Sequence, residues 1–177
     1  LSSGGSMFKN VILTGFMGVG KTSVGTRLAK DLGYAFVDTD ELIEADQKIT
    51  IAEIFSTFGE PYFRDTETRI IKQTLESDNQ VVSTGGGAVI RDENRKLFKE
   101  SGITICLLAR PEVIYERIKQ ETHRPLLHVP DPLSRITELL TAREDYYRQA
   151  DLVIDTSDKT VDQVICEIRE RVRHACC

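Results

Sequence analysis

Short runs of apolar residues alternate along the chain with longer segments in which apolar residues recur every three or four positions. The short runs are rich in β-branched residues and predict strands: NVILT (10–14), AFVD (35–38), QVVST (80–84), ITICLL (103–108) and LVID (152–155). The segments between them predict helices, most clearly near the end, where one helical face carries Val161, Val164, Ile165, Ile168 and Val172. Strands that alternate with helical crossovers predict a three-layer α/β fold with a parallel sheet.

Length and charge narrow the class of protein. The 177 residues suit one domain, which we expect to span residues 7–177. Residues 1–6, LSSGGS, precede Met7 and look like a remnant of cloning, so they do not enter the fold prediction. A net charge of −5 argues against a nucleic-acid binder. The absence of a secretory signal and of a long apolar run predicts a cytoplasmic protein without membrane contact.

One segment fits neither period. KQETHRPLLHVPD (119–131) is polar, contains two prolines, and lies between helices predicted to begin near Glu112 and Asp131. Long aperiodic loops in compact domains are often mobile lids, and we expect a lid over about 119–130. A disordered connection is the alternative.

The cysteines and histidines do not have the spacing of metal ligands. We expect Cys106 and Cys166 to be buried as small apolar residues. Cys176 and Cys177 are expected to form an exposed tail without function.

GFMGVGKT (15–22) matches the P-loop pattern, in which two glycines with four residues between them precede Lys and Thr. It follows a predicted strand and opens a predicted helix, where backbone N–H groups and the helix dipole bind phosphate. Lys21 is expected to span the β- and γ-phosphates, and the Thr22 hydroxyl to bind Mg²⁺. A purely structural glycine turn is the alternative, but it leaves Lys21 unexplained. The nucleotide-binding residues predicted here are Gly15, Gly18, Val19, Gly20, Lys21, Thr22 and Ser23.

Two further motifs follow predicted strands. In an extended chain Asp38 and Asp40 would face the same side, although an aspartate at such a position also commonly caps a helix. STGGGAVI (83–90) places Gly85, Gly86 and Gly87 after another strand, where a ligand can approach bare backbone. Ligands of open α/β sheets bind at the carboxyl ends of the strands, so these motifs should share one site with the P-loop.

Six motifs together resemble the shikimate kinases, in the right order and over nearly the whole chain. They are GFMGVGKT (15–22), DTD (38–40), GEPYFRDTE (59–67), TGGG (84–87), RPLL (124–127) and AREDYYRQAD (142–151). The resemblance implies a nucleoside-monophosphate-kinase-like P-loop fold, with a five-stranded parallel sheet of order 2-3-1-4-5. It also implies ATP-dependent phosphorylation of the shikimate 3-hydroxyl, with Mg²⁺ as cofactor. ATP and shikimate would be the partners of a monomer.

The resemblance also implies roles for single residues. Asp38 would hold Mg²⁺ through water, and Asp40 would bind shikimate and orient or deprotonate its hydroxyl. The resemblance places a substrate-binding region at about 38–67, which includes the implied contacts Phe55, Phe63, Arg64 and Glu67. The other implied substrate contacts are Gly85, Gly86, Gly87 and Arg143. Arg117 would stack on adenine. Arg124 would come from the lid to the transferring phosphate. The implied catalytic residues are Lys21, Asp40 and Arg124.

Alternatives remain for these assignments. Arg64 could be a surface ion-pair partner of Asp65 or Glu67, and Arg117 a solvated charge on a helix face. The loop DTSDKTVDQ (155–163) lacks the proline often found in the adenine-binding loop of the family. A gluconate kinase is the nearest enzymatic rival. A catalytically silent nucleotide-binding module is the rival from another class.

Overall fold

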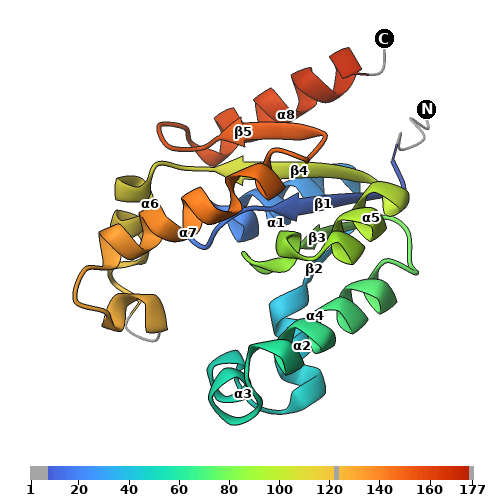
Figure 1. Ribbon diagram of the computed structural model, residues 1–177. Coiled ribbons are helices and arrows are strands. Elements are labelled where there is room, and N and C mark those ends of the chain that lie inside the picture. Colours follow the sequence, from blue (N-terminus) through green and yellow to red (C-terminus); the bar gives the residue numbers. More distant parts are fainter. Residues whose placement is uncertain (1–7, 122–123, 176–177) are drawn as a thin grey trace.

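The computed structural model describes residues 8–121 and 124–175 and has alternating strands and helices (Figure 1). The strands are β1 (Asn10–Thr14), β2 (Ala35–Asp38), β3 (Gln80–Ser83), β4 (Ile103–Leu108) and β5 (Leu152–Asp155). The α-helices are α1 (Lys21–Leu32), α2 (Thr39–Gln47), α3 (Ile51–Phe58), α4 (Glu60–Thr74), α5 (Asp92–Ser101), α6 (Pro111–Ile118), α7 (Pro132–Tyr147) and α8 (Val161–Ala175). Two short 3-10 helices are η1 (Ala88–Ile90) and η2 (Pro125–His128).

All five strands are parallel, in the order β2-β3-β1-β4-β5, which confirms the predicted sheet. The register aligns the strand ends: Ser83 of β3 lies opposite Leu13 of β1 and Asp38 of β2. The P-loop, the DTD motif and the glycine run therefore leave the sheet at one edge. This register, which no local sequence pattern specifies, creates the common site.

Each face of the sheet is covered by helices. Val11 and Leu13 of β1 belong to one cluster of buried residues, which includes Val24 and Leu28 of α1 and the apolar stripe of α8. Ile12, which points to the opposite face, belongs to a second cluster with Ile71 of α4, Phe98 of α5 and Tyr147 of α7. The alternation along one strand thus produces the three layers.

A smaller cluster stabilises the helices that project from the sheet edge. Ile43, Ile54, Phe63 and Ile70 are buried together and join α2, α3 and α4. In Figure 1 these helices extend away from the sheet below β2. The projecting helices include most of the region 38–67 for which substrate binding was predicted.

The strand and helix predictions agree closely with the structure, but one burial prediction is wrong. Cys106 is buried as expected, whereas Cys166 is exposed. Position 166 follows Val164 and Ile165 and lies off the apolar stripe of α8, so the helix turns its side chain to solvent. The aperiodic segment contains the short helix η2, which neither alternative anticipated. Across the part of the chain that the structure describes, no helix has the length and apolarity needed to span a membrane.

Residues outside the described ranges carry several of the predictions. The segment 1–6, the tail Cys176–Cys177, and Thr122 and His123 within the expected lid lie outside the described residues.

Asn10 joins β1 to the turn before β3. Its side chain is fully buried, donates from Nδ2 to the Ser77 carbonyl at 3.0 Å, and accepts from the Gln80 N–H at 3.0 Å. Asn10→Ala should lower the free energy of unfolding by about 1–3 kcal/mol, because the buried Gln80 N–H loses its partner, whereas the Ser77 carbonyl keeps a bond from Gln80 Nε2. Urea unfolding measures this, with the exposed neighbour Lys9→Ala as a control expected to change by less than about 0.5 kcal/mol. Equal effects of both substitutions would contradict the role assigned to Asn10.

Candidate active site

A cavity of about 380 Å³ opens at the carboxyl edge of the sheet. Its walls come from the P-loop, the start of α2, helices α3 and α4, the glycine loop after β3, helix α7 and the segment before η2. The residues lining it are Met17, Gly18, Gly20, Lys21, Thr22, Ser23, Asp38, Asp40, Ile51, Phe55, Phe63, Arg64, Glu67, Ser83, Thr84, Gly85, Gly86, Gly87, Glu121, Arg124 and Arg143. Most of the predicted site residues therefore meet in one place.

The P-loop presents an anion-binding helix end. The backbone turns through positive φ at Gly15, Gly18 and Gly20 before α1 begins at Lys21. The first turn of α1 contains no acidic residue, so its N–H groups and the helix dipole favour a negative ligand. Lys21 Nζ donates to the carbonyls of Gly15 at 2.5 Å and Phe16 at 2.9 Å, which hold the ammonium across the loop.

Asp38 and Asp40 both line the cavity, but not for the reason inferred from an extended chain. Asp38 is the last residue of β2, and its Oδ1 accepts from the N–H groups of Asp40 at 2.8 Å and Glu41 at 3.3 Å. Asp40 lies in the first turn of α2. The prediction from strand alternation is therefore wrong, whereas helix capping by Asp38 is correct and coexists with a place in the cavity.

Burial disfavours the charged forms of both Asp40 and Lys21. Burial raises the pKa of the Asp40 carboxyl to about 6, with Asp38 and Glu67 adding to the rise and Lys21 opposing it. Burial also lowers the pKa of the Lys21 ammonium to about 8, against the attraction of Asp40 and Asp38. Near neutral pH Asp40 is an anion whose proton affinity suits a general base.

Arg64 is held by a fully buried carboxylate. Its Nη1 donates to Glu67 Oε2 at 2.7 Å, and its side chain is only 11% exposed. Burial raises the pKa of Glu67 overall, although Arg64 opposes this. Asp65, by contrast, pairs with Arg91 at 2.7 Å. The alternative of a surface ion pair for Arg64 is therefore wrong, because its partner lies inside the protein.

The glycine loop accommodates these side chains. A Cβ on Gly85 would lie 2.8 Å from Asp40 Oδ1 and 2.9 Å from Glu67 Oε1, and one on Gly87 would lie 2.3 Å from Arg64 Nη2. All three contacts are shorter than real Cβ atoms make. From the sequence, these glycines were expected to let a ligand approach the backbone. The structure adds that Gly85 and Gly87 leave room for the protein's own charged side chains.

Arg143 reaches the same cavity from α7, with its guanidinium 5.7 Å from the centre of the Phe16 ring. Tyr147, one turn later, is buried and donates its hydroxyl to the Gly86 carbonyl at 2.6 Å. Burial raises the pKa of Tyr147 to about 12, so this donor stays protonated. Tyr147 was not predicted as a site residue, although its spacing of four from Arg143 on a helix was a usable signal.

Three of the predicted nucleotide-binding residues, Gly15, Val19 and Arg117, do not line the cavity. Arg117 Nη1 donates to the Gly18 carbonyl at 3.0 Å and its Nη2 to the Thr156 carbonyl at 2.9 Å, so it is not a freely solvated charge. Val19 is fully buried in the core, and its carbonyl accepts from the Thr156 hydroxyl at 2.7 Å. Thr156, which the sequence did not reveal, thus links the P-loop to the loop after β5.

The remaining predicted residues form an apolar wall and the mouth of the cavity. The rings of Phe55 and Phe63 lie 4.6 Å apart between centroids, with Phe63 buried and Phe55 partly exposed. Arg124 is half-buried and donates from Nε to a carboxylate oxygen of Glu121. Leu126 and Leu127 of η2 pack against the large core cluster.

The chain resembles known proteins over nearly all of its length. The model of the family described as shikimate kinase matches residues 17–173. A shikimate kinase from Thermodesulfovibrio yellowstonii is 53% identical over 156 residues, covering 88% of this chain and 90% of the relative. A shikimate kinase from Caldanaerobacter subterraneus is 47% identical, covering 90% and 94%.

Solved structures give the same result. The shikimate kinase from Acinetobacter baumannii in complex with shikimate has a TM-score of 0.90 and 34% identity, covering 96% of this chain and 95% of that chain. The shikimate kinase from Aquifex aeolicus has a TM-score of 0.83 and 34% identity, covering 94% and 98%.

The raised pKa of Asp40 has a consequence for stability. Between about pH 4 and 6 the folded protein binds a proton at Asp40 that the unfolded chain does not, so stability falls as the pH rises through this window. Asp40→Asn should therefore raise the free energy of unfolding at pH 7.5 by about 1–3 kcal/mol, since one pKa unit corresponds to about 1.4 kcal/mol. At pH 4 the two proteins should be equally stable in urea unfolding.

The matched control is Glu41→Gln on the same helical turn. Glu41 is exposed, so this substitution should change stability by less than about 0.5 kcal/mol at either pH. A lower free energy of unfolding for Asp40→Asn than for wild type at pH 7.5 would contradict the conclusion that the ionised Asp40 carboxylate destabilises the folded protein.

Proposed function

The chain belongs to the shikimate kinase family and transfers a phosphoryl group from ATP to shikimate, and from this premise we propose which residues carry out each part of the reaction. The observation that supports the proposal most is the single cavity in which the P-loop faces two aspartates and three arginines. Such a cavity suits a phosphate donor and a small acidic acceptor together. The gluconate kinase alternative and the silent module are disfavoured by relatives that are shikimate kinases over about nine tenths of the chain.

The phosphates of ATP bind the P-loop backbone and the start of α1. Lys21, held ready by the carbonyls of Gly15 and Phe16, moves its ammonium to the β- and γ-phosphates. Arg117 and the loop after β5 provide the adenine end, since Arg117 already joins the Gly18 and Thr156 carbonyls there. Phosphoryl transfer requires mainly positioning and charge stabilisation, which these groups supply.

Kinases that use ATP generally need a divalent metal, and we assign Mg²⁺ to Thr22 and, through water, to Asp38. The donors fit this ion: Asp38 uses Oδ1 to cap α2 and keeps its second oxygen, and Thr22 offers an exposed hydroxyl. In the described ranges no group of three or more His, Cys, Asp or Glu residues is placed to hold a metal, which agrees with an ion that keeps several waters and binds phosphate. When bound, Mg²⁺ offsets phosphate charge and eases transfer.

Shikimate is bound through its carboxylate by Arg64 and Arg143, whose planar guanidinium groups match a carboxylate. Glu67 fixes the orientation of Arg64. The backbone of Gly85–Gly87 forms the floor of the substrate site, and Phe55 and Phe63 form its apolar wall.

Asp40 orients the attacking 3-hydroxyl and accepts its proton, for which a pKa of about 6 is well suited. The proton leaves the hydroxyl as its oxygen bonds to the γ-phosphorus and the bond to the ADP oxygen breaks. The products are shikimate 3-phosphate and ADP.

Arg124 acts from the segment 119–130 as a lid residue. Arg124 lines the cavity and forms an ion pair with Glu121. Its guanidinium must break this ion pair to reach the transferring phosphate. Leu126 and Leu127 pack on the protein body and limit how far the segment moves. An additional positive charge at the transferring group lowers the barrier most when it arrives with closure.

A substrate panel tests the assignment directly. A coupled assay of ADP release with shikimate, gluconate and nucleoside monophosphates should give turnover with shikimate alone. Comparable turnover with gluconate or a nucleoside monophosphate would overturn it.

Arg64 and Arg143 should determine the affinity for shikimate. Truncation of either to Ala should weaken shikimate binding by about 2–5 kcal/mol while ATP binding persists, because a charged hydrogen bond in a partly buried site is lost. Calorimetric titration with each ligand measures both effects. Arg69→Ala on the same helix as Arg64 is the control, since Arg69 pairs with Asp46 outside the cavity and should leave shikimate binding unchanged. Unchanged shikimate affinity in Arg64→Ala would disprove the carboxylate role.

A further inference from the structure

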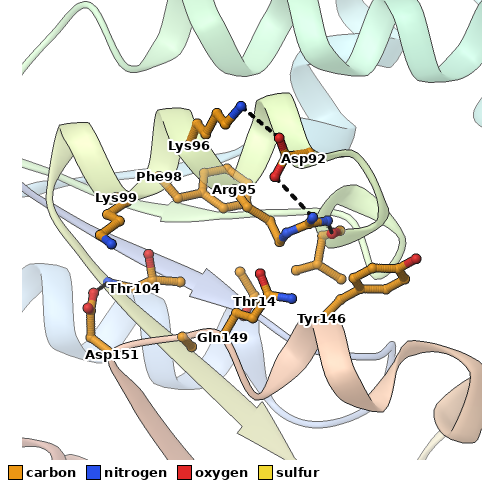
Figure 2. Close-up of a pocket in the computed structure, with 12 residues that line it drawn as sticks. Thr14, Asp92, Arg95, Lys96, Phe98, Lys99, Thr104, Tyr146, Gln149 and Asp151 are labelled. Atoms are coloured by element: carbon orange, nitrogen blue, oxygen red, sulfur yellow. Dashed lines mark hydrogen bonds and ion pairs between the residues drawn. The ribbon is translucent and has the colours of Figure 1, made fainter.

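A second cavity of about 380 Å³ lies between α5 and α7, against the face of the sheet that carries Thr14 and Thr104 (Figure 2). It shares no lining residue with the candidate active site. Its residues are Thr14, Val89, Asp92, Arg95, Lys96, Phe98, Lys99, Thr104, Tyr146, Gln149, Ala150 and Asp151. The volume falls within the range of small-molecule sites, roughly 300–1,000 Å³.

Two buried polar atoms at this cavity lack a strong hydrogen-bond partner. The Thr14 side chain is 1% exposed, and its Oγ1 has only the thiol of Cys106, the residue opposite on β4, as a partner in the described part of the chain. A thiol is a weak hydrogen-bond partner. Arg95 Nε is buried without a partner there, although the other nitrogens of its guanidinium are bonded. Buried polar groups are nearly always well satisfied, so these two atoms at one cavity favour a polar ligand.

The charges at the cavity favour an anion. Three cationic side chains, Arg95, Lys96 and Lys99, line the cavity with two carboxylates, Asp92 and Asp151, so the lining carries one positive charge in excess. Asp92 pairs with Arg95 at 3.2 Å and Lys96 at 2.8 Å, and Asp151 Oδ2 accepts from the Thr104 N–H at 2.8 Å. Lys99 has no ion pair with any residue of the described ranges.

The apolar residues provide flat surfaces. The ring of Tyr146 lies 4.8 Å from the Arg95 guanidinium carbon, which covers its face. Phe98 and Val89 are buried and complete an apolar side next to these charges. In Figure 2 the Phe98 and Tyr146 rings flank the Arg95 side chain, with Lys99 and Asp151 at the other end.

We propose that this cavity binds a small organic acid that carries a flat ring. The ring packs against Phe98, Val89 and Tyr146, and the acid group lies toward Lys99, where the positive charge has no partner among the described residues. The Thr14 hydroxyl and Arg95 Nε supply the remaining donors.

Benzoate is a suitable probe, with benzylamine as the same ring of opposite charge and acetate as the same charge without a ring. Calorimetric titration should show benzoate binding in the millimolar range, with both controls at least about tenfold weaker. Lys99→Glu should weaken benzoate at least about tenfold, whereas Lys30→Glu, an exposed lysine on α1, should leave it unchanged. Both variants should keep the wild-type thermal unfolding temperature, because both lysines are exposed.

The position of the bound probe is read independently. Methyl resonances of Val89 should shift with benzoate, and those of Ile51, which lines the candidate active site, should not. Arg64→Ala should bind benzoate as wild type does. Loss of binding in Arg64→Ala with retention in Lys99→Glu would place benzoate among the substrate arginines and overturn the proposal, and so would no saturable binding. The test needs no assumption about shikimate, so its failure would leave the proposed function untouched.

Discussion

The arrangement of the acceptor side of the site depends on one constraint: Glu67 is completely buried, and a buried carboxylate must have a cationic partner. Arg64 provides that partner at 2.7 Å and is thereby held in place before any ligand arrives. The pair packs so close to the chain after β3 that Gly85 and Gly87 have no room for a Cβ. The negative charge of Glu67 also contributes to the raised pKa of Asp40. One ion pair therefore accounts for the orientation of an arginine, two glycines and part of the proton affinity of the base.

At the phosphate-binding end of the cavity, burial shifts the pKa of Lys21 in the direction opposite to that of Asp40. Burial brings the pKa of Lys21 down to about 8 and that of Asp40 up to about 6, so burial disfavours the charged form of both groups. The cavity thus holds a cation and an anion that are both costly to bury, a cost that phosphate and metal charges would offset. An active site that carries such strain is less stable than a neutral version of it.

Distant segments hold the phosphate and substrate loops in position. Thr156, after the last strand, bonds the Val19 carbonyl, and Arg117 of α6 bonds the Gly18 carbonyl. Tyr147 of α7 does the same for the Gly86 carbonyl. Each loop therefore adopts its conformation through side chains that lie more than 50 residues away in the sequence. Substitution of such a residue would act on the reaction through the loop it holds.

The sequence by itself determined the strands, the helices and the P-loop, because these depend on local periodicity and on residue spacing within a few positions. The family motifs likewise identified Arg64, Arg143 and Asp40 as site residues, and the structure brings all three to one cavity. Only the tertiary structure decided that Asp40 lies in the first turn of a helix rather than at the end of a strand, and that Cys166 is exposed. The tertiary structure also revealed the shifted pKa values, the hydrogen bonds from Thr156 and Tyr147 to the loops, and the second cavity. These properties arise from strand register and helix packing between segments far apart in the chain, which leave no local pattern in the sequence.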